Sequence, residues 1–467
     1  MKKIVRYVCI MLTLVLCMVQ TPSVMASKKT TSSSLPKGPK AASLAAGSAI
    51  LMEASTGLIL YEKNIDKREY PASITKIMTA LVALENSSLD EVITYSKNAV
   101  YGIEYGSSNI AIEAGEKLTM EQSLYAIMLE SANEACLGVA EHIAGSVEGF
   151  VDMMNKKAKE LGCTNTHFVN PNGLHDDDHY VSAHDMALIA KAAIQNETFR
   201  KITSTKHYTI PKTNKKVERN WIKNHHQMLN GYKYPKYQYD YCIGGKTGYT
   251  TKAQNTLVTF AEKDGMTLIS VVLKDYGPYY EKNEYTDSTA LLNFGFDNFS
   301  LHSVKNAAST NSTGDYLFSQ YSGLLNEENP LIYIDPATNV ILPKGVTMDE
   351  VEQTPTFVDV KNYQEGENVI GTVSYSYNGI PVGTGNIIYN VQDINQLVTQ
   401  TQVDANTAVQ PLNSPANGIA NKIAFIVAAV IVGLGLIYYV YIVQKRKRQS
   451  AYYRKRRQSY YDHDDYL

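Results

Sequence analysis

The chain has 467 residues, 44% of them hydrophobic and 19% charged, which is typical of a globular protein and excludes a largely disordered one. Its length is sufficient for two or three domains with a sizeable core. The formal net charge is -2, but basic residues gather at both ends, so the stretch between residues 27 and 444 contains 33 basic and 43 acidic residues. Such an acidic chain argues against nucleic acid as a partner.

The first 26 residues have the features of a secretory signal peptide. Lys2, Lys3 and Arg6 precede an apolar run, and the small residues that end at Ala26 mark the expected cleavage site. Residues 27–42 are rich in Ser, Thr, Lys and Pro, so we expect a flexible leader. After cleavage only Cys136, Cys163 and Cys242 remain, which form neither a disulfide framework nor a metal-binding pattern; at most one bridge could form.

A second apolar segment lies near the other end of the chain. Residues 423–443 contain no charge and are long enough to span a bilayer, so we predict a transmembrane helix at 422–443. Eight Lys or Arg follow within Lys445–Arg457, and the positive-inside rule therefore places the tail, 444–467, in the cytoplasm. The signal peptide and this helix together predict a single-pass protein of the cell membrane with an extracytoplasmic ectodomain.

The elements expected between residues 43 and 300 alternate from strands to helices and back to strands. "SAILMEASTGLILYEKN" (48–64) predicts a hairpin, and a helix is expected from Ser73. Residues 118–161 have a helical pattern with a Thr119–Gln122 capping box and Gly162 as C-cap, and residues 182–194 predict a helix with a Ser182–Asp185 capping box. Strands at 243–250 and 255–275 and a helix at 288–296 follow. This order predicts an α+β domain: an antiparallel sheet flanked by helices, with a helical insertion.

Beyond residue 300 the pattern changes to short strands separated by Asn-Gly and Gly turns, with almost no helical signal. We therefore predict a small all-β sandwich domain at 301–395. Residues 396–421 are rich in Gln, Thr, Asn and Pro and read as a linker to the membrane.

The start of the helix at Ser73 combines two reactive side chains with an apolar surrounding. Ser73 and Lys76 are three residues apart, so a helix places them on one face within hydrogen-bond reach. Ile74, Ile77 and Met78 would desolvate the ammonium of Lys76, which lowers its pKa and leaves it partly neutral. A neutral amine beside a hydroxyl is a base beside its nucleophile. On this pair alone, the simpler interpretation is that Ser73 caps the helix and that the Lys76 side chain reaches solvent.

Two further motifs make the functional interpretation specific. Ser131-Ala132-Asn133 falls at a break between two helices, and Lys246-Thr247-Gly248 starts a strand that has the character of a sheet edge. Ser-x-x-Lys, Ser-x-Asn and Lys-Thr-Gly in this order are typical of penicillin-binding proteins and class A β-lactamases.

From about Ala46 to Asn395 the chain resembles the low-molecular-mass penicillin-binding proteins, the serine D-Ala-D-Ala carboxypeptidases. The likeness extends to "PASITKIMTA", "NPNGLHDDDHYVSAHDMALIA", "GGKTGYT" and "LPKGV". It implies a transpeptidase-like catalytic domain at 43–300 outside the membrane, and a β-sandwich stalk. The implied partners are peptidoglycan stem peptides and β-lactam antibiotics, the latter as covalent inhibitors, with no cofactor and no metal.

The resemblance also implies a role for each matching residue. Ser73 would attack the carbonyl between two terminal D-alanines and Lys76 would take its proton. Ser131 would relay a proton to the leaving amine and Asn133 would orient Lys76 and the substrate amide. Lys246 and Thr247, in the Lys-Thr-Gly motif completed by Gly248, would hold the terminal carboxylate, and the backbone N–H groups of Ser73 and Tyr249 would form the oxyanion hole.

One departure from the family leaves the choice of substrate open. Relatives often have an arginine after the strand that follows Lys-Thr-Gly, but this chain has none between Arg219 and Arg446 and offers Lys274 and Lys282 instead. Carboxypeptidase and D,D-endopeptidase activity therefore both remain open. A class A β-lactamase would need a deacylating glutamate on a loop between the second and third motifs. Glu197 and Glu218 lie there, but neither is in the Glu-x-x-Leu-Asn setting expected of such a residue. An inactive wall-binding or scaffold protein is a further alternative.

Histidine-rich stretches are the remaining candidates. The run from His175 to Asp185 could in principle bind zinc, but it reads as a solvated loop before a helix. His225 and His226 are expected on the surface or in the lining of a groove.

Overall fold

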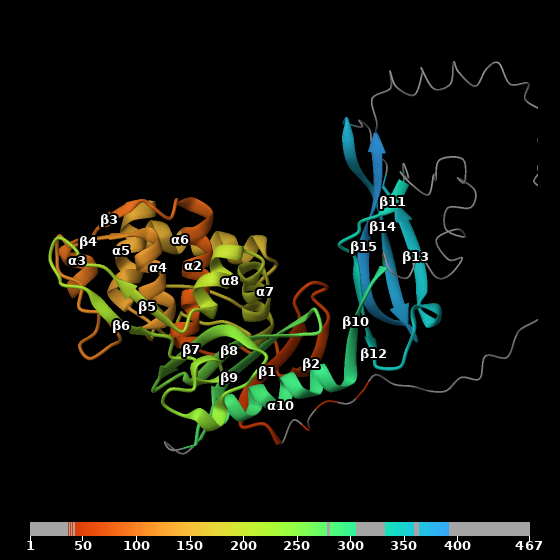
Figure 1. Ribbon diagram of the computed structural model, residues 1–467, viewed down its shortest axis with the longest axis horizontal. Helices are drawn as coiled ribbons and strands as arrows, with labels where there is room; N and C mark the ends of the chain where they lie inside the picture. The colour runs from red at the N-terminus through yellow and green to blue at the C-terminus, as the bar shows by residue number, and fades with distance from the viewer. Residues whose placement is uncertain are drawn as a thin grey trace, which may run out of the picture. The chain divides into compact units, whose positions relative to one another are not determined.

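The computed structural model describes residues 36, 38, 40, 43–277, 281–304, 332–358 and 364–391 (Figure 1). The predicted signal peptide (1–26), most of the leader (27–42), the linker (396–421), the transmembrane helix (422–443) and the tail (444–467) lie outside these residues. Within the described ranges, no helix has the length and apolar character needed to cross a membrane.

A five-stranded antiparallel sheet forms the centre of the domain expected at residues 43–300, in the order β2-β1-β9-β8-β7. The strands are β1 (Ala46–Glu53), β2 (Ile59–Lys63), β7 (Cys242–Thr250), β8 (Gln254–Lys263) and β9 (Met266–Asp275). The predicted hairpin is confirmed as β1–β2, and it joins the three later strands because β1 pairs with β9. The strand that carries Lys-Thr-Gly, β7, is an edge strand, as its sequence predicted.

Both faces of this sheet are buried, so neighbouring side chains of one strand enter different cores. In β1, Ile50 and Met52 belong to the core beneath the helical insertion, whereas Ala49 and Leu51 belong to the core beneath α10 (Asn283–Asn298). This alternation follows from the two-residue period of a strand. Figure 1 shows α10 on one side of the sheet and α2, α4, α5, α6, α7 and α8 on the opposite side.

The helical insertion occupies the chain between β2 and β7 and is arranged around one central helix, α2 (Lys76–Asn86). Because α2 contacts helices on several sides, eight of its 11 residues are buried. The other elements are α3 (Lys97–Tyr101), α4 (Met120–Leu129), α5 (Asn133–Ala144), α6 (Val147–Glu160), α7 (Ala183–Ile194), α8 (Glu197–Ser204), α9 (Gln227–Asn230), η3 (Pro235–Tyr237), and the two-stranded sheets β3 (Val92–Thr94) with β4 (Lys117–Thr119) and β5 (His207–Ile210) with β6 (Arg219–Lys223).

Two of the predicted helix starts need correction. The Thr119–Gln122 capping box of α4 is present, but at α7 only half of the box forms. Ser182 accepts the N–H of Asp185, whereas the Asp185 carboxylate turns away and accepts hydrogen bonds from Asn165 N–H and Thr166 Oγ1. The long loop before α7 competes successfully for this carboxylate, a tertiary contact that the local pattern could not reveal.

The helix predicted from Ser73 is also shorter than expected. Ser73 lies in a 3-10 turn, η2 (Ala72–Thr75), and α2 begins at Lys76. Ala72 has a φ of +51°, a left-handed conformation that a residue with a side chain seldom adopts, and this bend delays the helix. Gly162, by contrast, has the left-handed φ of +83° expected just after the end of α6.

The C-terminal described part is all-β, as its turn-rich sequence predicted. A four-stranded sheet has the order β11-β15-β14-β13, and a separate antiparallel pair joins β10 to β12. The side chains of Val340 and Leu342 in β12 share a core with Val373, Tyr375 and Ile387. The strands are β10 (Phe299–Ser303), β11 (Ile332–Ile334), β12 (Asn339–Pro343), β13 (Glu352–Phe357), β14 (Gly366–Tyr377) and β15 (Ile380–Val391), with a 3-10 turn η5 (Met348–Glu350).

Candidate active site

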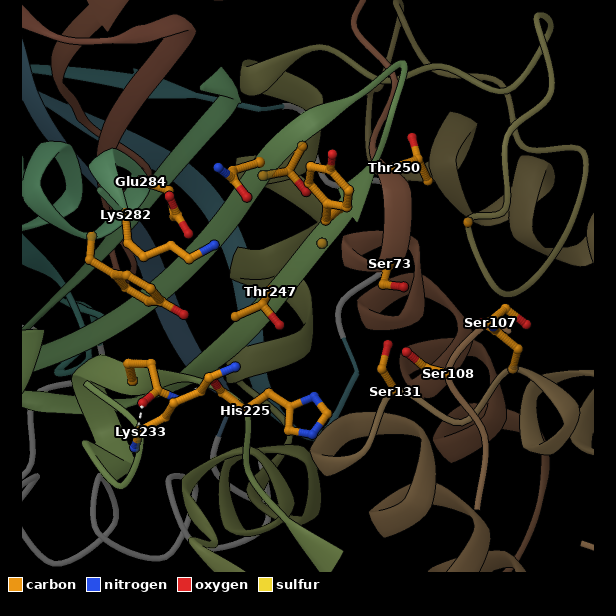
Figure 2. Close-up of a pocket in the computed structure, with 18 of the residues that line it drawn as sticks. Ser73, Ser107, Ser108, Ser131, His225, Lys233, Thr247, Thr250, Lys282 and Glu284 are labelled. Atoms are coloured by element: carbon orange, nitrogen blue, oxygen red, sulfur yellow. Dashed lines mark hydrogen bonds between the residues drawn. The ribbon is translucent and has the colours of Figure 1, made fainter. Parts of the chain in front are cut away.

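A cavity of about 540 Å³ opens where the start of α2, the α4–α5 connection, β7 and the start of α10 meet. Ser73, Ser131, Asn133, Thr247, Gly248 and Tyr249 all contribute to its lining. The three motifs, which are far apart in the sequence, therefore meet at a single cavity. Figure 2 shows Ser73 and Ser131 together on one side of it, with Thr247 opposite them.

The hydroxyl of Ser73 lies beside an amine that has little access to water. Lys76 Nζ lies 3.0 Å from Ser73 Oγ, and the Lys76 side chain is completely buried. Burial lowers the pKa of Lys76 to about 8, against the smaller raising effects of Cys136 and Glu134. A substantial fraction of Lys76 is therefore neutral near physiological pH and able to accept a proton from the hydroxyl.

Two neighbouring segments hold the Lys76 amine in place. Asn133 Oδ1 accepts a hydrogen bond from Nζ at 2.7 Å, and the backbone carbonyl of Asn172 accepts another. With the contact to Ser73 Oγ, these give Nζ three partners. The three partners fix the direction of the amine, whereas a lysine on a free surface would sample many rotamers.

Ser131 occupies the strained connection between α4 and α5. Its φ is +61°, although it has a side chain, and its Oγ is buried without a hydrogen-bond partner among the described residues. Strain and an unsatisfied hydroxyl both cost free energy, and features of this kind concentrate at functional sites. In Figure 2 the Ser131 hydroxyl points toward Ser73.

The Lys-Thr-Gly strand presents only part of its motif to the cavity. Thr247 contributes to the wall, but Lys246 is buried, and its Nζ donates a hydrogen bond to the carbonyl of Thr247 at 2.9 Å. Burial, assisted by the nearby charge of Lys76, lowers the pKa of Lys246 to about 7. Lys246 thus contributes a titratable positive charge behind the wall that Thr247 forms.

Close approach of β7 to η2 depends on glycine. A Cβ at Gly248 would lie 2.9 Å from the backbone nitrogen of Ser73 and would also collide with Thr256 Oγ1. Gly245 has a φ of +149°, and a Cβ there would lie 2.7 Å from Nε2 of the buried His226. Gly248 thus allows the strand to pass beside Ser73, and Gly245 allows it to pack against the ring of His226.

Comparison with known proteins adds an independent observation. The family described as D-alanyl-D-alanine carboxypeptidase matches residues 35–277. The chain belongs to this family. It is 33% identical to the D-alanyl-D-alanine carboxypeptidase DacA of Haemophilus influenzae over 356 residues, which cover 72% of this chain and 82% of the relative. It is 39% identical to the D-alanyl-D-alanine carboxypeptidase DacF of Bacillus subtilis over 260 residues, 55% of this chain and only 64% of that relative.

A solved structure gives the same assignment. Penicillin-binding protein 5 from Haemophilus influenzae aligns with a TM-score of 0.57 and 29% identity, over 76% of this chain and 98% of that one. The resemblance inferred from the three motifs is thereby confirmed, and the chain is a serine carboxypeptidase of the penicillin-binding protein superfamily.

Some residues of this carboxypeptidase's site were given no role from the sequence. Asn172 contributes a backbone carbonyl, which no side-chain motif encodes. Glu130, directly before Ser131, pairs with His225 Nε2 at 3.0 Å and accepts the N–H of Lys223 at 2.7 Å, so it connects the Ser131 loop to the segment after β6. His225 lines the cavity, as expected, but its neighbour His226 is buried under β8.

The histidine-rich loop is only partly the solvated segment that its sequence suggested. His179 is buried and its ring contacts Thr75 Oγ1 at 2.9 Å, and burial lowers the pKa of His179 to about 3. Within the described ranges, no cluster of three or more potential ligands is arranged to hold a metal ion. Through His179 the loop packs against Thr75, directly before α2.

The structure also distinguishes between the two lysines that could replace the arginine found in relatives. Lys274 pairs with Glu69 at 3.6 Å and is absent from the cavity wall, whereas Lys282 lines the cavity. Glu197 and Glu218, the two glutamates considered for a β-lactamase, are both exposed and neither lines the cavity.

Proposed function

We propose that this carboxypeptidase removes the terminal D-alanine from peptidoglycan pentapeptide stems through an acyl-enzyme on Ser73. The observation that carries the proposal is the 3.0 Å contact between Ser73 Oγ and a buried lysine amine whose pKa is about 8. In the first step Lys76 takes the hydroxyl proton while Oγ bonds to the carbonyl carbon between the two D-alanines.

The second half of acylation breaks the peptide bond. The C–N bond cleaves as Ser131 gives its hydroxyl proton to the departing amine and takes in its place the proton that Lys76 received from Ser73. D-alanine leaves with its carboxylate on the Thr247 side, near the charge of Lys246. Water then attacks the ester, and Ser73 is released. The backbone N–H groups of Ser73 and Tyr249 are proposed to bind the oxyanion that forms in both steps. β-lactams imitate the terminal dipeptide and acylate the same serine.

The decisive experiment is mass spectrometry of a synthetic pentapeptide that ends in D-Ala-D-Ala. The wild type is expected to release one alanine, and Ser73→Ala none, while Ser88→Ala, on an exposed loop after α2, serves as the control. Labelled penicillin should form a stable adduct with the wild type and with Ser88→Ala only. No labelling of the wild type would indicate an inactive wall-binding or scaffold protein, and rapid antibiotic turnover would indicate a β-lactamase.

We propose further that the catalytic domain is exported and held at the cell membrane. The signal peptide at 1–26, the apolar segment at 422–443 and the basic tail support this topology. A protease added to intact protoplasts should digest the ectodomain and leave an epitope tag at residue 467 protected. Digestion of the tag would contradict the proposed orientation.

A further inference from the structure

The first turn of α5 contains a buried acid that has no part in the reaction proposed for Ser73. Glu134 directly follows Asn133 of the Ser-x-Asn motif, and only 1% of the residue is exposed. An acidic residue in the first turn of a helix is favourable, but an exposed carboxylate would serve the helix equally well. Because burying a charge costs free energy unless something compensates for it, the position of Glu134 needs a separate explanation.

Hydrogen bonds fix the Glu134 side chain between the motif and the wall of the cavity. Its Oε1 accepts the N–H of Ile110 at 2.7 Å, in the loop 106–112, whose first three residues line the cavity. The backbone N–H of the neighbouring Asn133 donates to the carbonyl of Ser108 at 2.9 Å in the same loop. The carboxylate is therefore held at a fixed place directly behind the residue that contacts the Lys76 amine.

The second oxygen of Glu134 has no partner of its own. Its Oε2 is buried without a hydrogen bond to any described residue. The nearby Arg219 is occupied elsewhere, since its Nη2 pairs with Glu116 Oε1 at 2.8 Å and its Nε donates to the carbonyl of Ile110 at 3.1 Å. Burial raises the pKa of Glu134, while the backbone N–H donors and the charge of Arg219 oppose this effect.

The groups that act electrostatically on Lys76 differ in their charge. Glu134 and Cys136 belong to α5, Lys246 to β7 and His179 to the loop before α7. Burial raises the pKa of Cys136 to about 11 and lowers the pKa of Lys246 to about 7 and that of His179 to about 3. None of these three is negatively charged near pH 8, where Lys76 titrates, so among these groups only Glu134 supplies a negative charge.

We propose that Glu134 is a positioning residue whose buried negative charge stabilises the ammonium that Lys76 becomes when it takes the proton of Ser73. This inference rests on the proposed acylation of Ser73 and adds a residue to it. The proton passes from Ser73 Oγ to Lys76 Nζ as Oγ bonds to the carbonyl carbon, and Glu134 itself neither gains nor loses a proton. A charge that is already in place requires no reorganisation when the ammonium forms.

The test measures the rate of penicillin acylation at saturating concentration between about pH 6 and 10. Glu134→Gln removes the charge but keeps an oxygen that can accept the N–H of Ile110. The midpoint of the pH profile should fall by about half a pH unit or more, because the ammonium loses its negative neighbour. The limiting rate at high pH should fall about threefold, because a weaker base accepts a proton less readily. Glu104→Gln, which removes an exposed charge close to the same loop, should keep both wild-type values.

The direction of the shift distinguishes this role from a purely structural one. If the substitution only loosened the site, water would reach Lys76 and the midpoint would rise toward that of a solvated lysine. A midpoint at or above the wild-type value, or a limiting rate that is not reduced, therefore overturns the inference. Glu134→Asp keeps the charge and should keep the wild-type midpoint, and a midpoint as low as that of Glu134→Gln would overturn the inference as well.

Two further measurements make every outcome decisive. Urea unfolding verifies that Glu134→Gln is folded; if it is not, Glu134→Asp decides alone, and a midpoint below the wild-type value overturns the inference. A wild type that penicillin does not acylate overturns the proposed acyl-enzyme on Ser73 itself. A wild type that is acylated, combined with an unchanged profile in Glu134→Gln, overturns only the role of Glu134.

Discussion

The amino group of Lys76, the first residue of α2, lies 3.0 Å from the hydroxyl oxygen of Ser73, which lies in the η2 turn directly before that helix. The η2 turn places Ser73 at the cavity wall while Lys76, the first residue of α2, is directed into the interior. The nucleophile is therefore accessible to substrate while its base is shielded from water.

The rate of acylation should rise with pH and level off above about pH 8. Only neutral Lys76 accepts the proton, and burial lowers its pKa to about 8, so each pH unit below that value should reduce the rate about tenfold. We suggest measuring penicillin acylation at saturating concentration, which removes the effect of Lys246 on binding. A rate that does not change between pH 6 and 9 would exclude Lys76 as the base.

Asn133→Asp should move this profile to higher pH. The substitution places a carboxylate where Oδ1 lies 2.7 Å from Nζ, and a negative neighbour stabilises the charged amine. We expect the midpoint to rise by about 1 to 3 pH units, with lower activity at pH 7. Asn98→Asp, on the exposed side of α3, is the control and should leave the midpoint of the pH profile unchanged. A midpoint that moves to lower pH in Asn133→Asp would contradict the assigned contact.

Gly248→Ala should nearly abolish acylation. The new Cβ would lie 2.9 Å from the backbone nitrogen of Ser73, so β7 must move away from η2. A displacement of this kind costs about 100-fold in rate. Gly265→Ala, in the β8–β9 turn, has no atom within 4 Å of its Cβ and tests for general effects of glycine replacement. Comparable losses in both variants would argue against a specific role for the close approach.

Arg219→Ala should destabilise the domain strongly. Arg219 Nη2 lies 2.8 Å from Glu116 Oε1, with both side chains almost completely buried, so its removal leaves an uncompensated carboxylate. The expected loss is about 3 to 5 kcal/mol in the free energy of unfolding, measured with urea. Lys156→Ala breaks an exposed pair with Glu160 and should leave the unfolding midpoint unchanged. Equal effects in the two variants would show that burial does not decide the cost.

Lys282 and Lys274 should differ in their effect on substrate binding. Lys282 lines the cavity, so Lys282→Ala is expected to raise KM for a D-Ala-D-Ala peptide about fivefold by removing one positive charge near its carboxylate. Lys274 pairs with Glu69 outside the cavity wall, so Lys274→Ala should leave KM unchanged. The reverse result would reassign the carboxylate contact.

Several structural features of this enzyme could be predicted from its sequence because each depends on residues that are close together in the chain. The β1–β2 hairpin, the Thr119–Gln122 capping box and the break at Ser131 each depend on residues close together in the chain. The motif residues could be named for the same reason, since their order and spacing are specific. The signal peptide at 1–26 and the transmembrane helix at 422–443 remain predictions from the sequence alone.

Tertiary structure decided what depends on contacts between distant segments. The half-formed cap at Asp185, the buried position of Lys246 and the carbonyl of Asn172 beside Lys76 are set by packing, for which no local pattern exists. The same holds for Glu134, whose sequence reads as an ordinary first-turn acid. Charge and hydrogen bonding of a side chain depend on its burial, and burial is a property of the assembled fold and not of a short stretch of sequence.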